Sequence, residues 1–413
     1  MPLDFPSSPV DGQVYDNWVY SSAKGAWLAK PLEPATAVTS DTAPPNPIDG
    51  DMWYNTNDGT TYVWYDDGNS AQWVEMVAPV TASGYLSPNY VINGGFDINQ
   101  RGFTSVTNSA IYGFDRWSFN QQGGGTSVFS AQTFTVGEAP FTKYAARNFF
   151  RAVSSGYSAT NSVTNLTHPI EDVRTLSDST ITVSFWAKAG SGTPKVSIEM
   201  QQNFGTGGST IILINAGAVT LSTSWQRYSL TVALPSISGK TIGINHSLNT
   251  VFWFNAGTDF ASRTNSIGVQ NNTFDIWGVQ VEEGSVATPF RRSGNTIQEE
   301  LANCQRYYQR WNAASVGSRP SSGLVSTATT AALDLQLGVD FRAVPALEYS
   351  GNADWTLLNA GVTPTITGLT ISGAATNRSG SMNVTVSGGL TLGHAASLRA
   401  GTATAWIALN AEL

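Results

Sequence analysis

The sequence is poor in cysteine, histidine and charge. The single cysteine, Cys304, cannot form an internal disulfide, and the three histidines have no metal-ligand spacing. Charged residues are only 12% of the chain, which excludes a coiled-coil rod or an α-solenoid. No cluster of Lys and Arg accompanies the formal charge of −8. We therefore expect no nucleic-acid partner and no insertion into a membrane.

Catalytic motifs and targeting segments are also missing. The chain has no G-x-S-x-G elbow, Walker A loop, G-x-G-x-x-G or H-E-x-x-H. Its first ten residues lack the basic and apolar regions of a signal peptide. We expect no enzyme, no catalytic residues and no cofactor, in a protein made in the cytoplasm. The alternative, a glycosidase, needs a carboxylate pair, and the acidic residues to inspect for it are Glu171, Asp172, Asp275, Glu282 and Glu283.

Aromatic and turn-forming residues are abundant instead. Aromatics make up 11% and hydrophobic residues 41%, and the chain contains 40 glycines and 18 prolines. This composition is typical of many short strands, so we predict an all-β protein. Apolar residues alternate with polar ones in several segments, as expected of strands. These segments are 181–185, 196–200, 228–234, 277–281 and 333–341, and residues 366–371, 382–392 and 405–409 also look like strands.

An imperfect repeat opens the chain. Residues 10–29 and 48–76 each run from Asp-Gly through aromatic pairs and a polar turn to a final tryptophan, Trp27 or Trp73. Each copy predicts a small β-meander that its tryptophan closes. The predicted organisation is a meander (1–30), a Pro-rich linker (31–47), a second meander (48–86), a jelly-roll β-sandwich (87–293), a connecting helix (294–312) and a C-terminal β-sandwich-like domain (313–413).

One segment has helical periodicity. Apolar residues follow a 4-3-4-3 spacing, and Thr296 with Glu299 predicts a capping box. The stripe consists of Ile297, Leu301, Cys304, Tyr308 and Trp311. It either packs on the sandwich or forms a short seam between subunits. In the second case the subunit-interface candidates are Ile297, Leu301 and Tyr308.

Several short motifs come in an order that resembles bacteriophage tail-fibre and related virion proteins. They are residues 93–97 (NGGFD), 100–102 (QRG), 114–117 (FDRW), 278–284 (GVQVEEG), 287–290 (ATPF), 304–308 (CQRYY), 341–345 (FRAVP) and 411–413 (AEL). The resemblance covers most of the chain and is firmest over residues 89–308.

The resemblance implies a virion protein assembled in the host cytoplasm. Its function would be that of a tail fibre or tail-tip adhesin, a homotrimer that binds host-surface polysaccharide. The N-terminus would anchor it to other virion proteins, with Trp27 and Trp73 as anchoring candidates. Two alternatives stay open: a structural virion protein, such as a head fibre, capsid decoration or adaptor, and a polysaccharide-degrading tailspike.

The central part also resembles a carbohydrate-binding jelly roll. Such modules often hold a structural calcium, which maps onto Asp97 and Asp275 as candidate ligands. Trp225 resembles their core tryptophan, so we expect it to pack rather than stack on sugar. Core positions are also expected for Trp186, Trp253, Trp355 and Trp406. The sequence does not locate the carbohydrate-binding residues.

Overall fold

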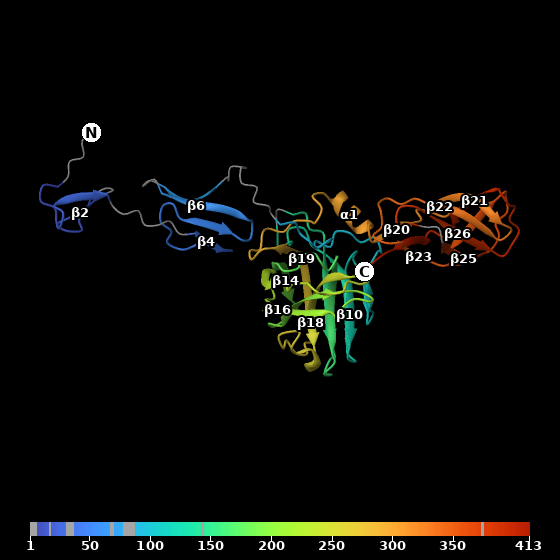
Figure 1. The fold of residues 1–413 in the computed structure, drawn as a ribbon, viewed down its shortest axis with the longest axis horizontal. Coiled ribbons are helices and arrows are strands. Elements are labelled where there is room, and N and C mark those ends of the chain that lie inside the picture. The colour runs from blue at the N-terminus through green and yellow to red at the C-terminus, as the bar shows by residue number, and fades with distance from the viewer. Residues whose placement is uncertain are drawn as a thin grey trace, which may run out of the picture. The chain divides into compact units, whose positions relative to one another are not determined.

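Strands dominate the part of the chain that the computed structural model describes, residues 6–15, 18–29, 37–66, 70–76, 87–141, 144–372 and 376–413 (Figure 1). The all-β prediction is therefore confirmed. One α-helix, α1 (Ile297–Gln305), occurs among these residues. None of the helices in these ranges is long and apolar enough to cross a membrane. The chain divides into two units, residues 1–83 and 84–413.

The first N-terminal module is the predicted antiparallel meander. Its strands are β1 (Val14–Tyr15), β2 (Trp18–Ser21) and β3 (Ala26–Ala29), in the order β1-β2-β3. The ring of Trp27 lies 6.1 Å from that of Tyr15 and 5.5 Å from that of Tyr20. The final tryptophan of the repeat thus packs on the preceding strands, as aromatic pairs across strands do.

The second N-terminal module contains one strand in the segment that was predicted to be a linker. Its strands are β4 (Ala37–Ser40), β5 (Met52–Asn55), β6 (Thr60–Asp66) and β7 (Ala71–Glu75). Strands β5 to β7 form the predicted meander, and Trp73 contacts the rings of Trp53 and Trp64. Strand β4 pairs parallel to β5, although it lies in the predicted linker. Its proline-free, partly β-branched residues can pair with a strand edge. Residues 31–36 of the linker lie outside the described residues.

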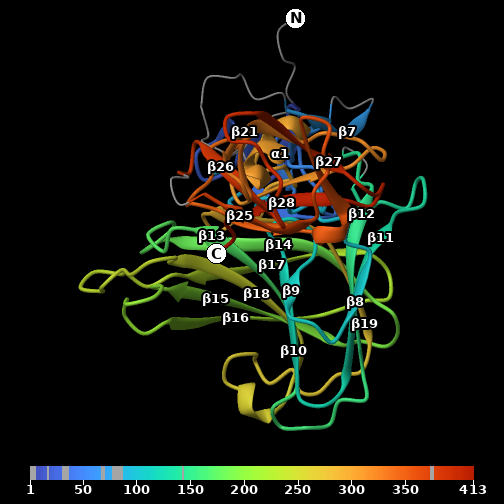
Figure 2. The ribbon, with the colours of Figure 1, turned by 90° about the vertical axis from the view of Figure 1, so that its right-hand side faces the viewer.

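Two six-stranded sheets form the jelly roll. Sheet I has the order β16-β15-β18-β13-β10-β9, and sheet II the order β17-β14-β19-β12-β11-β8. Figure 2 shows β13, β15, β16 and β18 of sheet I side by side. The strands are β8 (Ser105–Thr107), β9 (Ile111–Tyr112), β10 (Ser118–Gln122), β11 (Thr126–Thr133), β12 (Asn148–Ser155), β13 (Val163–Glu171), β14 (Thr180–Ala189), β15 (Lys195–Asn203), β16 (Ile212–Thr220), β17 (Gln226–Ala233), β18 (Ser247–Ala256) and β19 (Thr273–Glu283).

Sheet II is buried on both faces at its centre. One face of β14 and β19 joins the sandwich core, and the other carries Trp186 and Trp277. The rings of Tyr144 and Phe290, from segments outside the sheet, lie 5.5 and 5.0 Å from that of Trp277. This second aromatic layer explains why β14 and β19 are buried almost throughout. It also leaves the outer face of sheet I as the accessible sheet surface to consider for ligands.

The two ends of the jelly roll meet. Asn89 donates from Nδ2 to the carbonyl oxygens of Val279 and Arg291, and Arg291 donates to the carbonyl of Ser87. The following Asn-Gly-Gly turn packs against the same strand, because a Cβ on Gly94 would lie 2.0 Å from the Val279 carbonyl oxygen. Only glycine permits that approach. Chain entry and exit are therefore tied together at strand β19.

Helix α1 begins as predicted but ends early. Thr296 and Glu299 form the capping box, and the helix stops at Gln305. Residues Tyr308–Asn312 form strand β20 and pair with β28 (Trp406–Asn410). The predicted helix over 294–312 is thus wrong at its C-terminal end. Strand pairing and the burial of Tyr307 and Tyr308 override a helical period that was carried by aromatic residues, which fit strands well.

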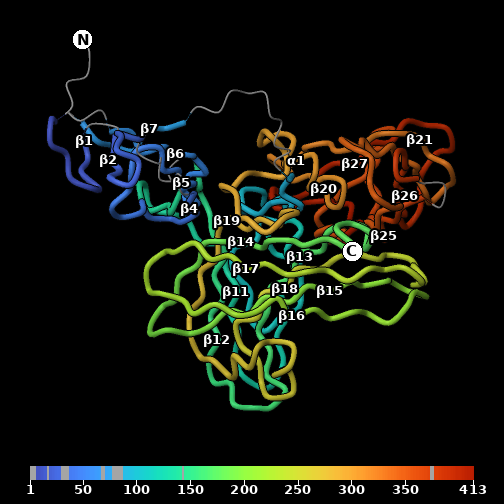
Figure 3. Tube along the Cα trace, turned by 60° about the vertical axis from the view of Figure 1, so that its left-hand side comes forward, coloured from blue at the N-terminus to red at the C-terminus, as the bar shows by residue number. Residues whose placement is uncertain are grey.

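The C-terminal domain packs a six-stranded sheet III on a three-stranded sheet IV. Their orders are β24-β27-β21-β22-β26-β25 and β20-β28-β23, and Figure 3 shows β21, β26 and β27 grouped at the red end of the chain. The remaining strands of this domain are β21 (Ser321–Thr327), β22 (Thr330–Leu335), β23 (Ala346–Tyr349), β24 (Trp355–Asn359), β25 (Ile366–Ile371), β26 (Gly380–Val386) and β27 (Ala395–Ala400). A short 3-10 helix, η2 (Asn352–Asp354), precedes β24, and another, η1 (Thr258–Phe260), follows β18 in the jelly roll.

Most of the short motifs meet where the C-terminal domain joins the jelly roll. Arg116 is fully buried; it contacts the Glu412 carboxylate and the Pro169 carbonyl, and its Cζ lies 3.4 Å from the centroid of the Tyr307 ring. Although burial disfavours the charged guanidinium, Glu412 holds the pKa of Arg116 above its usual value. The C-terminal residues are thereby locked onto the jelly roll.

A second arginine of this junction repeats the arrangement. Arg101 lies over the Tyr308 ring at 3.6 Å and forms ion pairs with Glu412 at 3.4 Å and Asp115 at 3.8 Å. Burial raises the pKa of Asp115 to about 6 against these favourable contacts. The motifs of the sequence therefore build a joint between domains.

Candidate functional site

The outer face of sheet I carries rows of polar side chains. Strand pairing places Glu199 beside Asn215 in one row, and Gln201 beside Asn249 in the next. The opposite side chains of β15, including Ile198 and Met200, point into the core. This alternation follows from the two-residue period of a strand, which here separates apolar from polar residues. Val251 on β18 completes the row of Glu199, and Leu213 on β16 completes the row of Gln201.

A buried ion pair organises this face. Glu199 is fully buried, and both its oxygens accept hydrogen bonds from Arg263 at 2.8 Å. The Arg263 guanidinium in turn lies 5.0 Å from the Trp253 ring and 5.8 Å from the Phe260 ring. Arg263 belongs to the loop after β18, so the pair fastens this loop over one end of the face. Trp253, which is 2% exposed, is covered there and cannot stack on a ligand.

Hydrogen bonds extend from Glu199 along the open part of the face. Gln201 donates to Glu199 at 2.8 Å, Asn249 donates to Gln201 at 3.4 Å, and Ser247 donates to Asn249 at 2.8 Å. Because a carboxylate only accepts, Glu199 fixes which end of each amide points toward it. The chain therefore holds two amide groups in defined orientations. Each amide keeps further donor and acceptor capacity.

This arrangement suits a ligand that has hydroxyl groups and an apolar ring face. The amides of Gln201 and Asn249 can each donate to and accept from hydroxyls. Leu213, opposite Gln201 on the neighbouring strand β16, is 41% exposed and supplies apolar surface. Ordered amides lose little entropy on binding, which favours recognition of weakly held polar ligands. The face is thus a candidate saccharide-binding surface, which we call the amide face (Glu199, Gln201, Leu213, Asn249 and Arg263).

The acidic residues singled out for a glycosidase are each engaged by other side chains. Glu171 accepts from Arg306 and Tyr307, which hold its pKa low against the effect of burial. Asp172 pairs with Arg174 and Asp275 with Arg151, while Glu282 contacts Arg291 and Glu283 accepts from Ser179.

The metal candidates Asp97 and Asp275 each contact an arginine. Asp275 accepts from Arg151 at 2.6 and 2.8 Å, and Asp97 lies 3.3 Å from Arg292. Burial raises the pKa of Asp97, which opposes the ionised form that a metal needs. Within the described ranges no group of three or more His, Cys, Asp or Glu could hold a metal ion. A calcium site at these two residues stays a prediction.

Most of the tryptophans assigned to the core lie there. Trp186, Trp253 and Trp355 are 4%, 2% and 3% exposed, which confirms the prediction for these three. Trp406 is only partly buried, with Arg310 4.3 Å above its ring. Trp225 is also partly buried and packs on Phe134 and Phe149, as expected.

The three candidate residues for a subunit interface differ in how exposed they are. Tyr308 is 2% exposed and packs under Arg101 inside the chain, so this residue is not available to a seam between subunits. Ile297 is 38% exposed and Leu301 is partly exposed. A subunit contact through these two stays a prediction, as does the anchoring role of Trp27 and Trp73.

The amide face itself was not identified from the sequence. Its residues alternate with apolar ones on β15, a pattern that marks an outward-facing strand but not its function. Residue Arg263 lies 64 positions from its partner Glu199, so no local pattern reveals their pairing. The available signal was the run of Glu, Gln and Asn on one strand face.

Comparison with known proteins places the similarity on this part of the chain. Residues 173–247 match the family model of a carbohydrate binding domain, CBM_4_9. These residues include β15 and β16 and reach the first residue of β18. The chain thus contains a jelly-roll domain similar to carbohydrate-binding modules. No curated relative matches the chain in sequence.

Several solved structures are also similar. A CBM4 structure is 15% identical over 47% of this chain and 99% of its own, with a TM-score of 0.27. The CBM22-2 xylan-binding domain of Paenibacillus barcinonensis Xyn10C is 13% identical over 40% and 91%, with a TM-score of 0.27. A Stig cyclase from Fischerella sp. TAU is 9% identical over 48% and 98%, with a TM-score of 0.32.

Proposed function

We propose that the protein is a glycan-binding fibre protein of a bacteriophage virion, whose jelly roll binds host-surface polysaccharide through the amide face. The observation that carries the binding role is the ordered pair of amides, Gln201 and Asn249, beside exposed Leu213. The family match over residues 173–247 supports the same ligand class. Single sugar sites are weak, so several copies on one particle would raise the effective affinity by ~10²–10⁴.

The virion role is supported by the sequence motifs and by the serial β modules. In this proposal the N-terminal modules attach a homotrimer to the tail, and the chain binds without catalysing a reaction. The protein would be assembled in the host cytoplasm and need no cofactor. Purified polysaccharide distinguishes the two alternatives. A structural virion protein would not bind it, and a polysaccharide-degrading tailspike would cleave it.

Exchange of both amides for alanine, Gln201→Ala with Asn249→Ala, should abolish most glycan binding. Each neutral hydrogen bond contributes about 0.5–1.5 kcal/mol, so affinity should fall by roughly 10- to 100-fold. Binding is measured by affinity electrophoresis and calorimetry against polysaccharides purified from bacterial cell surfaces. The matched control is Gln226→Ala, an exposed amide on β17 of sheet II.

The result that would contradict the amide face is unchanged affinity in the double variant together with an intact thermal transition. Loss of affinity in Gln226→Ala alone would place the site on sheet II instead. Release of reducing ends from the polysaccharide by the unmodified protein would favour the tailspike alternative.

Labelled antibody against the chain should decorate tail fibres of intact particles in electron microscopy. Light scattering on the purified protein should give the mass of a trimer of 43.9 kDa chains. Decoration of the capsid without binding to polysaccharide would support the structural alternative. Absence of label from any particle, or a single-chain mass at micromolar concentration, would refute the fibre assignment.

A further inference from the structure

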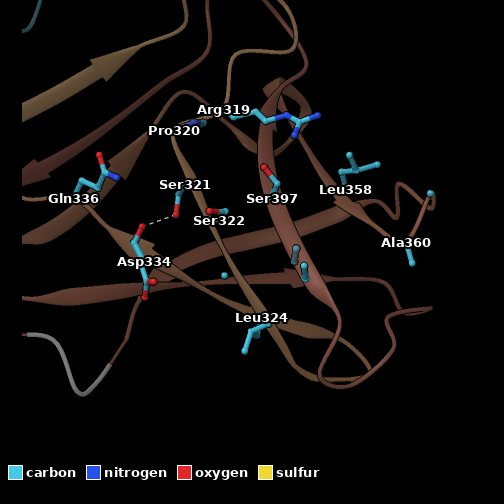
Figure 4. Close-up of a pocket in the computed structure, with 14 residues that line it drawn as sticks. Arg319, Pro320, Ser321, Ser322, Leu324, Asp334, Gln336, Leu358, Ala360 and Ser397 are labelled. Atoms are coloured by element: carbon cyan, nitrogen blue, oxygen red, sulfur yellow. Dashed lines mark hydrogen bonds between the residues drawn. The ribbon is translucent and has the colours of Figure 1, made fainter.

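A hollow lies on the outer face of sheet III, in the C-terminal domain. Its volume is about 780 Å³, and it crosses β24, β27, β21 and β22. Figure 4 shows Asp334 and Gln336 on one side of it, Leu358 and Ala360 on the other, and Arg319 opposite Leu324. Hollows of this size bind small ligands in many proteins.

The floor of the hollow is made of small side chains. Ser322 and Ser397 face each other across β21 and β27, and Ala395 lies in the next row. Such a floor lets a flat ring approach the sheet, and the hydroxyls offer hydrogen bonds. Leu324, 58% exposed, supplies apolar surface at one end. The combination of hydroxyl, amide, carboxylate and aliphatic groups matches a sugar ring, which has hydroxyl edges and apolar faces.

The cations at the other end distinguish this hollow from the amide face. Among the described residues, Arg319 has neither an ion pair nor a hydrogen bond from its side chain, and it is exposed at the rim of the hollow. Arg399 lies on the same face of sheet III, and its Nε is buried with no partner in the described part of the chain. Arg263 of the amide face is instead committed to Glu199 at 2.8 Å. A free guanidinium favours a carboxylate, which it can bind through two parallel hydrogen bonds.

We propose that this hollow binds an oligosaccharide that carries a carboxylate, with Arg319 as the residue that selects the acid. This proposal rests on the proposed function only for the class of ligand, a saccharide. The residues of the hollow belong to the C-terminal domain, and none of them is part of the amide face. Arg319 holds the carboxylate, Asp334 and the serines take the hydroxyls, and Leu324 contacts the ring.

The test compares tri-galacturonic acid with neutral α-1,4-galactotriose on the full chain by calorimetry, at 50 and 300 mM salt. The acid should bind at least tenfold more tightly, and the added salt should weaken its binding. Arg319→Gln should remove this preference by lowering affinity for the acid roughly 10- to 100-fold. Ser322→Trp should fill the hollow and abolish binding, because Ser322 lines its floor. The variant should fold, since position 322 is exposed.

The matched control is Arg378→Gln, an exposed arginine of the same domain that pairs with Asp340. It should leave the affinity for the acid unchanged. No binding of the acid, or equal binding of both sugars, would overturn the proposal. Binding that survives Ser322→Trp but is lost in Gln201→Ala with Asn249→Ala would also overturn it, while supporting the amide face. Binding that survives the double variant but not Ser322→Trp would support the hollow independently of the amide face.

Discussion

Replacing Arg116 with methionine should lower the free energy of unfolding of residues 84–413 by about 3–5 kcal/mol. The substitution leaves the Glu412 carboxylate, whose side chain is 4% exposed, without its closest cation, and it removes the cation from the Tyr307 ring. Only Arg101, 3.4 Å away, then remains near that carboxylate, and a buried charge that loses its main partner costs more than the original pair contributed. Urea denaturation followed by intrinsic fluorescence measures the change.

Two further variants test whether the loss of stability comes from the Arg116–Glu412 ion pair itself. Arg174→Met removes an exposed pair with Asp172, whose side chains are 58% and 38% exposed, and should cost less than about 1 kcal/mol. Arg116→Met combined with Glu412→Leu should recover part of the loss, because neither charge is then stranded. A loss below 1 kcal/mol for Arg116→Met would mean that the junction is not held by this pair.

On the amide face, Arg263→Met should lower the free energy of unfolding more than Glu199→Leu does. The first variant strands a carboxylate that is fully buried, whereas the second frees an arginine whose side chain is 28% exposed and can reach water. We expect losses of about 3–5 kcal/mol for Arg263→Met and roughly 2 kcal/mol for Glu199→Leu, from the cost of unpaired buried charges. Thermal denaturation and limited proteolysis of the loop after β18 provide the measurements.

Both variants should also reduce glycan binding, since the amides of Gln201 and Asn249 take their orientation from Glu199. The isosteric Glu199→Gln keeps the shape but offers one donor to Arg263 in place of an acceptor. The affinity of Glu199→Gln for glycan should therefore lie between that of the unmodified protein and that of Glu199→Leu. Equal stability of Glu199→Leu and Arg263→Met would show that burial does not set the cost of breaking this pair.

The strands of the sandwich were predictable because their pattern is local. Residues 181–185 and 196–200 alternate as buried strands facing one core must, and they form parts of β14 and β15. Residues 277–281 lie in β19, where a register shift against β14 leaves Trp277 on the other face of the sheet. Alternation alone did not set strand ends: the pattern over 333–341 continues past Leu335, where β22 stops. Strand length depends on the partner strand, which the local pattern does not encode.

The features that were mispredicted depend on contacts between distant residues. The aromatic stripe of α1 continues into β20 because Tyr308 packs on Arg101 and pairs with Asn410. The Glu199–Arg263 pair and the hollow of sheet III arise in the same way, so neither site could be located before the sheets were known.

The meeting of the two ends of the jelly roll determines how the domain would carry mechanical load. A pull on the chain entering at Ser87 and leaving after Arg291 is transmitted through the direct contacts between these residues and through Asn89. The strands of sheet I lie outside this short path. Tension along a fibre would therefore reach the C-terminal domain without stretching β15 and β18, and the amide face would keep its geometry under drag.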